Sequence, residues 1–320
     1  MKPPTTHQTA PVLYHYPASP YAEKVRLLFA LSQTRWSSVL VDPQPPRPVL
    51  QALVGGYRRI PVLQIGADVF CDSRICAKVI ATESSSPELS EDVMSRIAAD
   101  LAREAEGRVF FASVGAAKTH RALWMLFTMG GLRGIRLFLQ DRQRMMRGAR
   151  VDAPRGRRAL EVLLDFCGRL DTCLQSRPFL AGDAPGYADA CCYHPLWMWR
   201  RLGGESTLRQ FSHVRRWCSA LDQVARPSPE QLTADQALDR ALNQAPRPLP
   251  DSGQASDLLH RKVRVSPSDY AFDATEGELV YIDDQVIIIA RDTARTGIVH
   301  IHFPVAGYAL VDITEDHRDE

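Results

Sequence analysis

The first 84 residues alternate short apolar runs with amphipathic stretches. Two segments with helical period, YAEKVRLLFALSQT (21–34) and SRICAKVIATE (73–83), predict helices. Four short apolar runs bounded by turn-forming residues predict strands: PVLYHY (11–16), WSSVLVDP (36–43), IPVLQIG (60–66) and DVFCDS (68–73). The order β-α-β, then a loop or helix, then β-β-α indicates a small mixed α/β domain over residues 11–84.

Residues 90–244 show helical periodicity and no clear strand, which predicts an all-helical domain. The helical runs cover 90–115, 119–147, 155–176, 187–202, 207–224 and 229–244. The most apolar stretch, ALWMLFTMGGLRGIRLFL, carries Arg133, Arg136 and a Gly-Gly pair. These residues make it a poor membrane span, and we predict a buried helix with a bend.

The pattern changes again after the Pro- and Ser-rich linker QAPRPLPDSGQAS. Five short β-rich runs follow with polar turns between them: KVRVSP, GELVYID, QVIIIARD, GIVHIHF and GYALVDI. They predict a small all-β, barrel-like module at residues 257–313, of a size that is marginally stable alone.

Composition narrows the functional classes. The formal charge of +2 over 320 residues favours neither a nucleic acid nor a membrane as partner. Seven cysteines without a C-x-x-C pair indicate reduced, buried thiols of a cytoplasmic protein. The N-terminal MKPPTTHQTAPV has no apolar core, so no signal peptide is expected. Cys191, Cys192 and His194 fit a helical core better than a metal site, and no metal is expected.

Three features of the first 80 residues are candidates for chemistry: Ser19-Pro20 at a strand-to-helix junction, Arg59-Ile60-Pro61-Val62 before a strand, and Asp72-Ser73 at a helix start. Each also has an ordinary structural explanation. Ser19 and Asp72 or Ser73 can cap helices, and Pro61 can open an edge strand.

Together the three features suggest one ligand. A strand that begins at a cis Ile60-Pro61 bond can pair with an extended peptide. The helix start at Asp72-Ser73 offers amides to a carboxylate and an acid to an ammonium. The hydroxyl of Ser19, at a second helix start, can stabilise a thiolate. A ligand with an α-amino acid end, a peptide backbone and a thiol matches glutathione.

The segments LYHYPASPYAEKVRLLFAL, YRRIPVLQIGADVFCDSRICAKVI and RPFLAGDAPGYADACCYHPL, in this order, resemble the cytosolic glutathione S-transferases of the serine and cysteine type. The resemblance covers roughly residues 11–225. It implies a thioredoxin-like N-terminal domain at 11–84 and an all-α glutathione-transferase domain at 90–244. The β-module at 257–313 is not part of the ordinary family.

Carried over by position, the resemblance implies that Ser19 is the catalytic hydroxyl. Pro61 matches the cis proline, and Val62 the residue whose backbone pairs with the cysteinyl unit. Asp72 and Ser73 match the pair that holds the γ-glutamyl end, although the family more commonly has Glu-Ser. Arg59 matches a position that contacts the tripeptide. Outside the ligand site, Asp189 matches a buried aspartate with a folding role, and Gly186 replaces the usual capping Ser or Thr.

Serine instead of cysteine at position 19 favours conjugation of the glutathione thiolate to an electrophilic small molecule, because a serine cannot form a mixed disulfide. Tyr14, Tyr16 and Tyr21 are alternative hydroxyl donors. A second-substrate pocket between the first two domains is expected to include Tyr21, Phe110, Phe111 and Trp124.

The resemblance also implies glutathione as co-substrate, a homodimer and a role in detoxification. The alternative is a non-catalytic glutathione-transferase-like scaffold that binds a protein partner through the β-module or through the arginine-rich segment 133–158.

Overall fold

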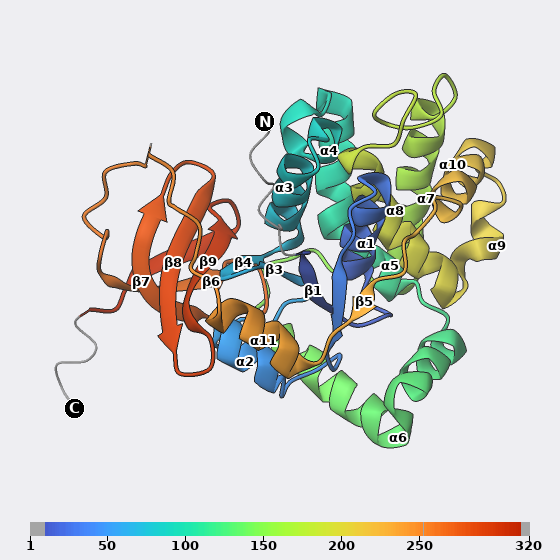
Figure 1. The fold of residues 1–320 in the computed structure, drawn as a ribbon. Coiled ribbons are helices and arrows are strands. Elements are labelled where there is room, and N and C mark those ends of the chain that lie inside the picture. The colour runs from blue at the N-terminus through green and yellow to red at the C-terminus, as the bar shows by residue number, and fades with distance from the viewer. Residues whose placement is uncertain (1–9, 252, 315–320) are drawn as a thin grey trace. The chain divides into compact units, whose positions relative to one another are not determined.

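The computed structural model describes residues 10–251 and 253–314, which divide into two compact units (Figure 1). Unit 1 is drawn from Met1–Tyr16, Arg35–Cys76 and Ser228–Glu320. Unit 2 consists of Pro17–Thr34 and Ala77–Pro227. The thioredoxin-like domain, the helical domain and the C-terminal strands predicted from the sequence are all present.

Unit 1 is built on one ten-stranded sheet with the strand order β10-β6-β7-β8-β9-β4-β3-β1-β2-β5. The strands are β1 (Val12–His15), β2 (Ser37–Leu40), β3 (Val62–Ile65), β4 (Asp68–Cys71), β5 (Glu230–Gln231), β6 (Lys262–Pro267), β7 (Thr275–Ile282), β8 (Val286–Thr293), β9 (Gly297–Pro304) and β10 (Tyr308–Asp312). β1 runs parallel to β2 and antiparallel to β3, and β4 is antiparallel to β3. This half is the mixed sheet that the sequence predicts.

The C-terminal strands continue this sheet. β9 pairs in parallel with β4, with Val69 in register with Ile301, and Figure 1 shows β9, β8 and β7 following β4 in one twisted array. Among the described residues β10 pairs with β6 and with no second strand, so the expected barrel-like closure is not seen. The apolar residues of β8 and β9 are buried in a core that also includes residues of α2 (Pro48–Val54) and α11 (Ala234–Leu242).

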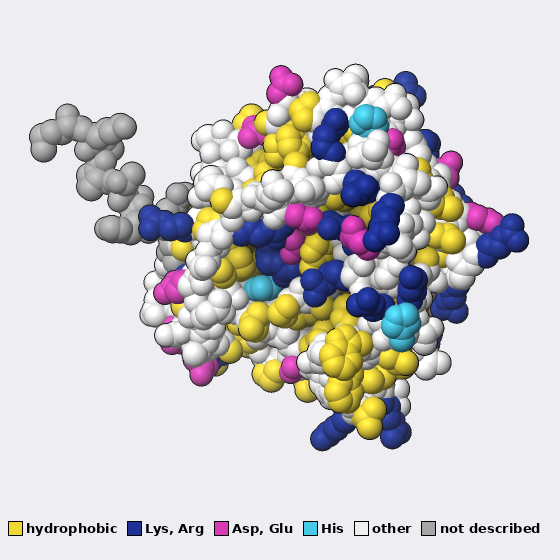
Figure 2. Space-filling view, turned by 90° about the vertical axis from the view of Figure 1, so that its right-hand side faces the viewer, with side chains coloured by type: hydrophobic (Ala, Val, Ile, Leu, Met, Phe, Trp, Pro, Cys, Tyr) yellow, Lys and Arg dark blue, Asp and Glu magenta, His cyan; other side chains and the backbone are white. Residues whose placement is uncertain are grey.

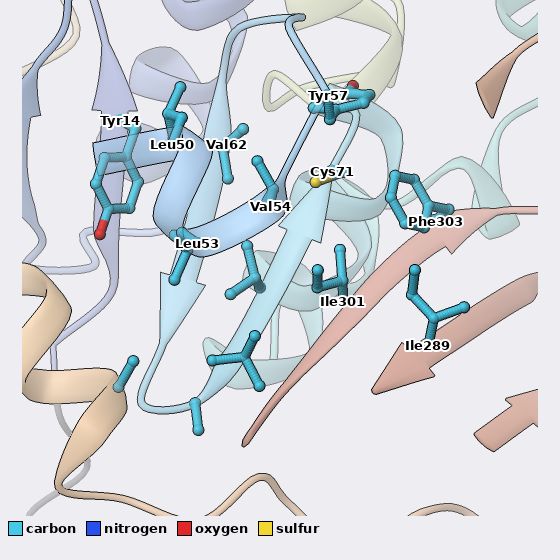
Figure 3. Close-up of a cluster of buried hydrophobic side chains, with 14 of the residues drawn as sticks. Tyr14, Leu50, Leu53, Val54, Tyr57, Val62, Cys71, Ile289, Ile301 and Phe303 are labelled. Carbon is cyan, nitrogen blue, oxygen red and sulfur yellow. The ribbon is translucent and has the colours of Figure 1, made fainter. Parts of the chain in front are cut away.

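A single hydrophobic core runs across the junction of β4 and β9. Figure 3 shows Val62 and Cys71 on β3 and β4 in the same cluster as Ile301 on β9 and Ile289 on β8. Ile301 and Phe303 are completely buried, as is Val69 opposite them. The C-terminal strands therefore share their core with the thioredoxin-like strands.

Two helices pack on the sheet of unit 1 and on each other: α2 (Pro48–Val54) and α11 (Ala234–Leu242). The sequence predicts a loop or a helix between the second and third strands, and the structure has the helix α2, with Pro48 in its first turn, where the fixed φ of proline favours a helix. The sequence predicts residues 229–244 as part of the helical domain. In the structure α11 instead contacts the sheet, where Gln64 Nε2 donates to the Ala237 carbonyl at 3.0 Å.

The segment from β7 to β8 also caps the end of α2. Thr275 Oγ1 donates to the Val54 carbonyl at 2.7 Å, and Arg291 Nη1 donates to the Ala52 carbonyl at 2.5 Å. Both carbonyl groups lie in the last turn of α2, where backbone carbonyls have no hydrogen-bond donor within the helix. At Gly56 an added Cβ would lie 2.2 Å from the Ala274 carbonyl oxygen, so only glycine permits this close approach.

Unit 2 is helical and has α8 at its centre. Its α and π segments are α1 (Pro20–Leu31), most of α3 (Ser73–Glu83), α4 (Arg96–Glu104), a π-helix (Ala105–Val109), α5 (Phe110–Gly115), α6 (Thr119–Met145), α7 (Gly156–Cys173), α8 (Tyr187–Trp199), a second π-helix (Arg200–Gly204), α9 (Glu205–Leu208) and α10 (Ser212–Asp222). α8 packs against α1, α4, α5 and α10. The buried carboxylate of Asp189 accepts hydrogen bonds from the amides of Leu180 (2.8 Å), Ala181 (3.2 Å) and Gly186 (3.0 Å) and from Trp217 Nε1 (2.7 Å).

Helix α6 departs from its predicted burial. The bend is present, since Gly130 and Gly131 leave helical backbone angles, but Leu126 is the one buried residue of the helix. Leu132 is 78% exposed and Trp124 65%. Apolar composition alone misled the prediction. Figure 2 shows hydrophobic side chains at the foot of the face it views, at the height of α6 in Figure 1.

Candidate functional site

Ser19 is the N-cap residue of α1 and is 2% exposed. Its Oγ accepts a hydrogen bond from the Ala22 amide at 3.2 Å, and Pro20 begins the helix behind it. The Ser19 hydroxyl hydrogen has no acceptor within the described part of the chain. Ser19 therefore caps α1 through its oxygen. Its hydroxyl hydrogen is not used in the cap and can be donated to a ligand at the positive end of the helix.

Two of the alternative hydroxyl donors are already bonded. The Tyr14 hydroxyl donates to Gln64 Oε1, and burial raises the Tyr14 pKa above its usual value. The Tyr21 hydroxyl donates to the Glu106 carbonyl at 2.6 Å. Both tyrosines therefore have structural partners, and Ser19 remains the better candidate donor to a sulfur.

The Ile60-Pro61 peptide bond is cis, as the sequence reading required. Val62 is the first residue of β3 and is in register with Tyr14 of β1 and Cys71 of β4. Because strands flank Val62 on both sides, its backbone is not open to a ligand. The amide and carbonyl of Ile60 have no partner among the described residues. In the described residues it is therefore Ile60, rather than the predicted Val62, whose backbone groups are free to pair with a ligand.

Asp72 caps α3 and carries an unusual backbone conformation, with φ at +101°. Its carbonyl accepts from the Cys76 amide at 3.1 Å, and its Oδ1 accepts from the Arg74 amide at 2.9 Å. Ser73 follows at the first helical position and is 7% exposed. The Ser73 amide and hydroxyl have no partner in the described residues, so two donors at a helix start remain for an anionic group.

These groups lie at the same end of two paired strands. Val62 and Cys71 face each other across β3 and β4, so Pro61 and Asp72 are the next residues on either side of that pair. Ile60, Pro61, Asp72 and Ser73 thus form one half-site in unit 1. Ser19 belongs to unit 2 and is described separately.

Arg59, the predicted tripeptide contact, is already engaged by the loop between β6 and β7. Its guanidinium forms an ion pair with Asp269, donates to the Tyr270 carbonyl and lies 4.1 Å from the Tyr270 ring centroid. Next to it, Arg58 Nη1 lies 3.6 Å from Asp273 Oδ2. The loop therefore compensates the charge of Arg59, which weakens the case for Arg59 as a ligand contact.

The structure brings three of the four predicted second-substrate residues together. The Tyr21 ring lies 4.8 Å from Phe110, and Phe110 lies 5.1 Å from Phe111 (centroid distances). His194 of α8 joins them, 4.7 Å from Tyr21. Trp124 stacks instead on Phe127 along the exposed α6, at 6.3 Å. The aromatic cluster is therefore defined as Tyr21, Phe110, Phe111 and His194.

His194 is fully buried, and neither ring nitrogen has a hydrogen-bond partner in the described chain. Burial lowers its pKa well below the usual value, which keeps the ring neutral at pH 7. In the described residues no group of three or more His, Cys, Asp or Glu side chains is placed to hold a metal ion. All seven cysteines are free, and six are buried.

Sequence reasoning missed the residues that the C-terminal strands bring to the half-site. Asp269 and Tyr270 reach Arg59, and the Tyr308 hydroxyl donates to Asp72 Oδ2 at 3.1 Å. Tyr308 is separated from Asp72 by 236 residues. No local signal identifies such a contact, because it depends on which strand edge the C-terminal strands pair with.

Comparison with known proteins agrees with this geometry. Residues 13–88 match the model of the glutathione S-transferase N-terminal domain, and residues 151–220 match that of the C-terminal domain. None of the curated proteins matched the sequence.

A GST-like protein from Pseudomonas syringae is 28% identical, with a TM-score of 0.75 over 95% of this chain and 99% of that one. This coverage is too large to leave out the C-terminal strands. Glutathione S-transferase III in its apo form is 19% identical, with a TM-score of 0.46 over 69% of this chain and 100% of that one. FzlA from C. crescentus is 19% identical, with a TM-score of 0.43 over 67% and 88%.

Proposed function

Because the chain carries the N- and C-terminal domains of the glutathione S-transferase family, we propose that it conjugates glutathione to electrophilic small molecules. The observation that carries this proposal is Ser19, a helix-capping hydroxyl with its hydrogen still to donate. The unpaired backbone of Ile60 and the unpaired donors of Ser73 support a peptide ligand with an α-carboxylate.

In the proposed reaction the glutathione thiol first loses its proton to solvent. The Ser19 hydroxyl donates to the resulting thiolate, and the N-terminus of α1 adds its positive dipole. A hydrogen bond to a charged group contributes about 1.5–3 kcal/mol and the dipole about 0.3–1 kcal/mol. At about 1.4 kcal/mol for each pH unit, the two effects together lower the thiol pKa by about one to three units, of which the Ser19 hydroxyl accounts for about one to two. The sulfur then forms the bond to the electrophilic carbon, whose leaving group departs with the bonding pair.

The aromatic cluster supplies apolar ring faces and edges for the electrophile. Tyr21 and Phe110 belong to this cluster, and the neutral ring of His194 adds no charge. We assign Tyr21, Phe110 and Phe111 to the second-substrate site and leave Trp124 out. Free cysteines are consistent with a cytoplasmic, reducing location, and a homodimer remains our expectation from the family.

The test is thiol consumption by the purified full chain with glutathione and a panel of activated aryl halides and epoxides. Ser19→Ala should reduce kcat/KM by about 10- to 100-fold at pH 7, as expected for one to two pH units of thiol pKa. The matched control is Ser32→Ala at the other end of α1, whose hydroxyl bonds the Phe29 carbonyl and Thr34. Equal rates for both variants would contradict the role of Ser19.

A second candidate function is a non-catalytic scaffold for a protein partner, and α6 favours it. The helix is exposed, and it is long and apolar enough to cross a membrane. We do not interpret it as a span, because of its arginines and its glycine bend. Absence of glutathione binding to the wild-type chain would leave the scaffold as the better account.

A further inference from the structure

The acid of the half-site is held by a residue from the far end of the chain. Tyr308 opens β10, and its hydroxyl donates to Asp72 Oδ2 at 3.1 Å, while the Arg74 amide donates to Oδ1. Each carboxylate oxygen thus has one partner and keeps further lone pairs for a ligand. Asp72 needs such support because its φ of +101° is unfavourable for a residue with a side chain.

Tyr57 lies next to Tyr308 and hydrogen-bonds to it. The hydroxyls of Tyr57 and Tyr308 lie 3.0 Å apart, and burial raises the pKa of both, so both remain protonated at neutral pH. Tyr308 has one hydrogen, which goes to the carboxylate because an ionised carboxylate can only accept. Tyr57 must therefore donate to Tyr308. The relay runs from Tyr57 through Tyr308 to Asp72 and orients the carboxylate.

Ring packing fixes the relay in place. The Tyr57 and Tyr308 rings are stacked with centroids 6.4 Å apart, and Phe303 of β9 lies 5.7 Å from Tyr57 and 5.4 Å from Tyr308. Figure 3 shows Tyr57 above Cys71, the residue before Asp72, with Phe303 on the neighbouring strand. Phe303 of β9 and Tyr308 of β10 thus pack around the hydrogen-bonded tyrosines and hold the Asp72 carboxylate in position.

We infer that Tyr308 is a positioning residue of the ligand site, and that the C-terminal strands complete the subsite for the ligand's ammonium group. The inference rests on the proposed function, in which Asp72 and Ser73 hold the γ-glutamyl end of glutathione. Asp is one methylene shorter than the Glu usual at this position, so a fixed orientation matters more for its reach. Tyr308 supplies that orientation.

The C-terminal strands and the loop between β6 and β7 also determine the charge at the ligand site. Asp269 forms an ion pair with Arg59, so the positive charge of Arg59 is neutralised by a residue of the protein itself. Among the described residues the carboxylate of Asp72 accepts from two neutral groups, the Tyr308 hydroxyl and the Arg74 amide, and forms no ion pair. The subsite therefore recognises thiols with a free, charged α-amino group.

The experiment measures glutathione affinity by calorimetry for the wild-type full chain and for Tyr308→Phe. Loss of the hydroxyl should raise Kd by about 10- to 100-fold, the range for losing one hydrogen bond to a charged group. The control is Tyr281→Phe, a buried tyrosine on β7 whose hydroxyl bonds Asp283 rather than a site residue. Its Kd should stay within twofold of the wild type. Thermal melting of each variant checks that the fold is intact.

A second ligand separates positioning from general damage. N-acetylglutathione lacks the ammonium, so Tyr308→Phe should change its Kd by less than twofold, and the two changes together form a double-substitution cycle. An equal loss for both ligands would show that Tyr308 acts on the fold alone. Unchanged glutathione affinity in Tyr308→Phe would overturn the inference while leaving the proposed function intact. No glutathione binding by the wild type would overturn both.

If Tyr308→Phe has a clearly lower melting temperature than the wild type, Tyr57→Phe tests the same relay one residue further from Asp72. It should raise the Kd of glutathione and leave the Kd of N-acetylglutathione unchanged.

Discussion

Replacing Ile301 by alanine should destabilise the thioredoxin-like strands as well as the C-terminal ones. Ile301 lies where β9 meets β4, in register with Val69 on one side and Ile289 on the other. All three side chains are completely buried. The substitution opens a cavity between a strand from the N-terminal half of the chain and strands from its C-terminal end.

The magnitude follows from the three carbons removed. At about 0.8 kcal/mol for each buried methylene, the lost transfer free energy is about 2.4 kcal/mol. The cavity adds to this, so the free energy of unfolding should fall by about 3–4 kcal/mol, within the range for large-to-alanine substitutions in cores. The control, Ile298→Ala, lies on the same strand with its side chain 52% exposed and should cost less than about 0.5 kcal/mol.

The assay is urea denaturation combined with hydrogen exchange of the backbone amides, read by mass spectrometry on peptides from β3–β4 and from β7–β9. Because one core spans both groups, Ile301→Ala should lower the protection of both together. If β7–β9 lose protection while β3–β4 keep theirs, the C-terminal strands unfold separately, and the shared core would be refuted.

Two further predictions concern stability. Asp189→Ala should lower the free energy of unfolding by about 3–5 kcal/mol, because three amides and the Trp217 indole lose a buried hydrogen-bond acceptor. Urea denaturation measures this loss, with the exposed Asp183→Ala as the control. A loss below about 1 kcal/mol would contradict the capping role of Asp189. Burial lowers the pKa of His194 and of His300, so the unfolded chain binds protons below about pH 6.5 that the folded chain does not. Stability should be full above that pH and fall as the pH drops towards the folded-state values. Melting temperatures between pH 5 and 8 measure the slope, which should be shallower in His194→Phe, and an unchanged slope would argue against the buried histidine.

Local patterns in the sequence predicted much of the half-site and the helix-capping role of Ser19. Ser19 before Pro20 and an amphipathic helix predicts an N-cap, and the hydroxyl bonds the third amide as such caps do. The motif around Ile60 and Pro61 pointed to a cis bond, and Asp72 to a helix start, and the structure has both. Each of these features depends on residues that are close together in the chain, so it can be predicted from the sequence alone.

The contacts made by the C-terminal strands could not be predicted in this way. Alternation of apolar and polar residues predicted the strands β6–β10, but it does not say which edge they join. Pairing of β9 with β4 brings Tyr308 to Asp72 and Asp269 to Arg59, across more than 200 residues. The exposure of α6 was also unpredictable, because apolar composition does not reveal whether a partner element covers a helix.

Proton release on glutathione binding measures whether Ser19 stabilises the thiolate. Glutathione is titrated calorimetrically into the wild type and Ser19→Ala between pH 6 and 8, in buffers of different ionisation enthalpy. We expect the wild type to bind glutathione and to release more protons near pH 7 than Ser19→Ala, because the Ser19 hydroxyl lowers the thiol pKa. Equal proton release by the two proteins, or no binding by the wild type at millimolar glutathione, would contradict this expectation.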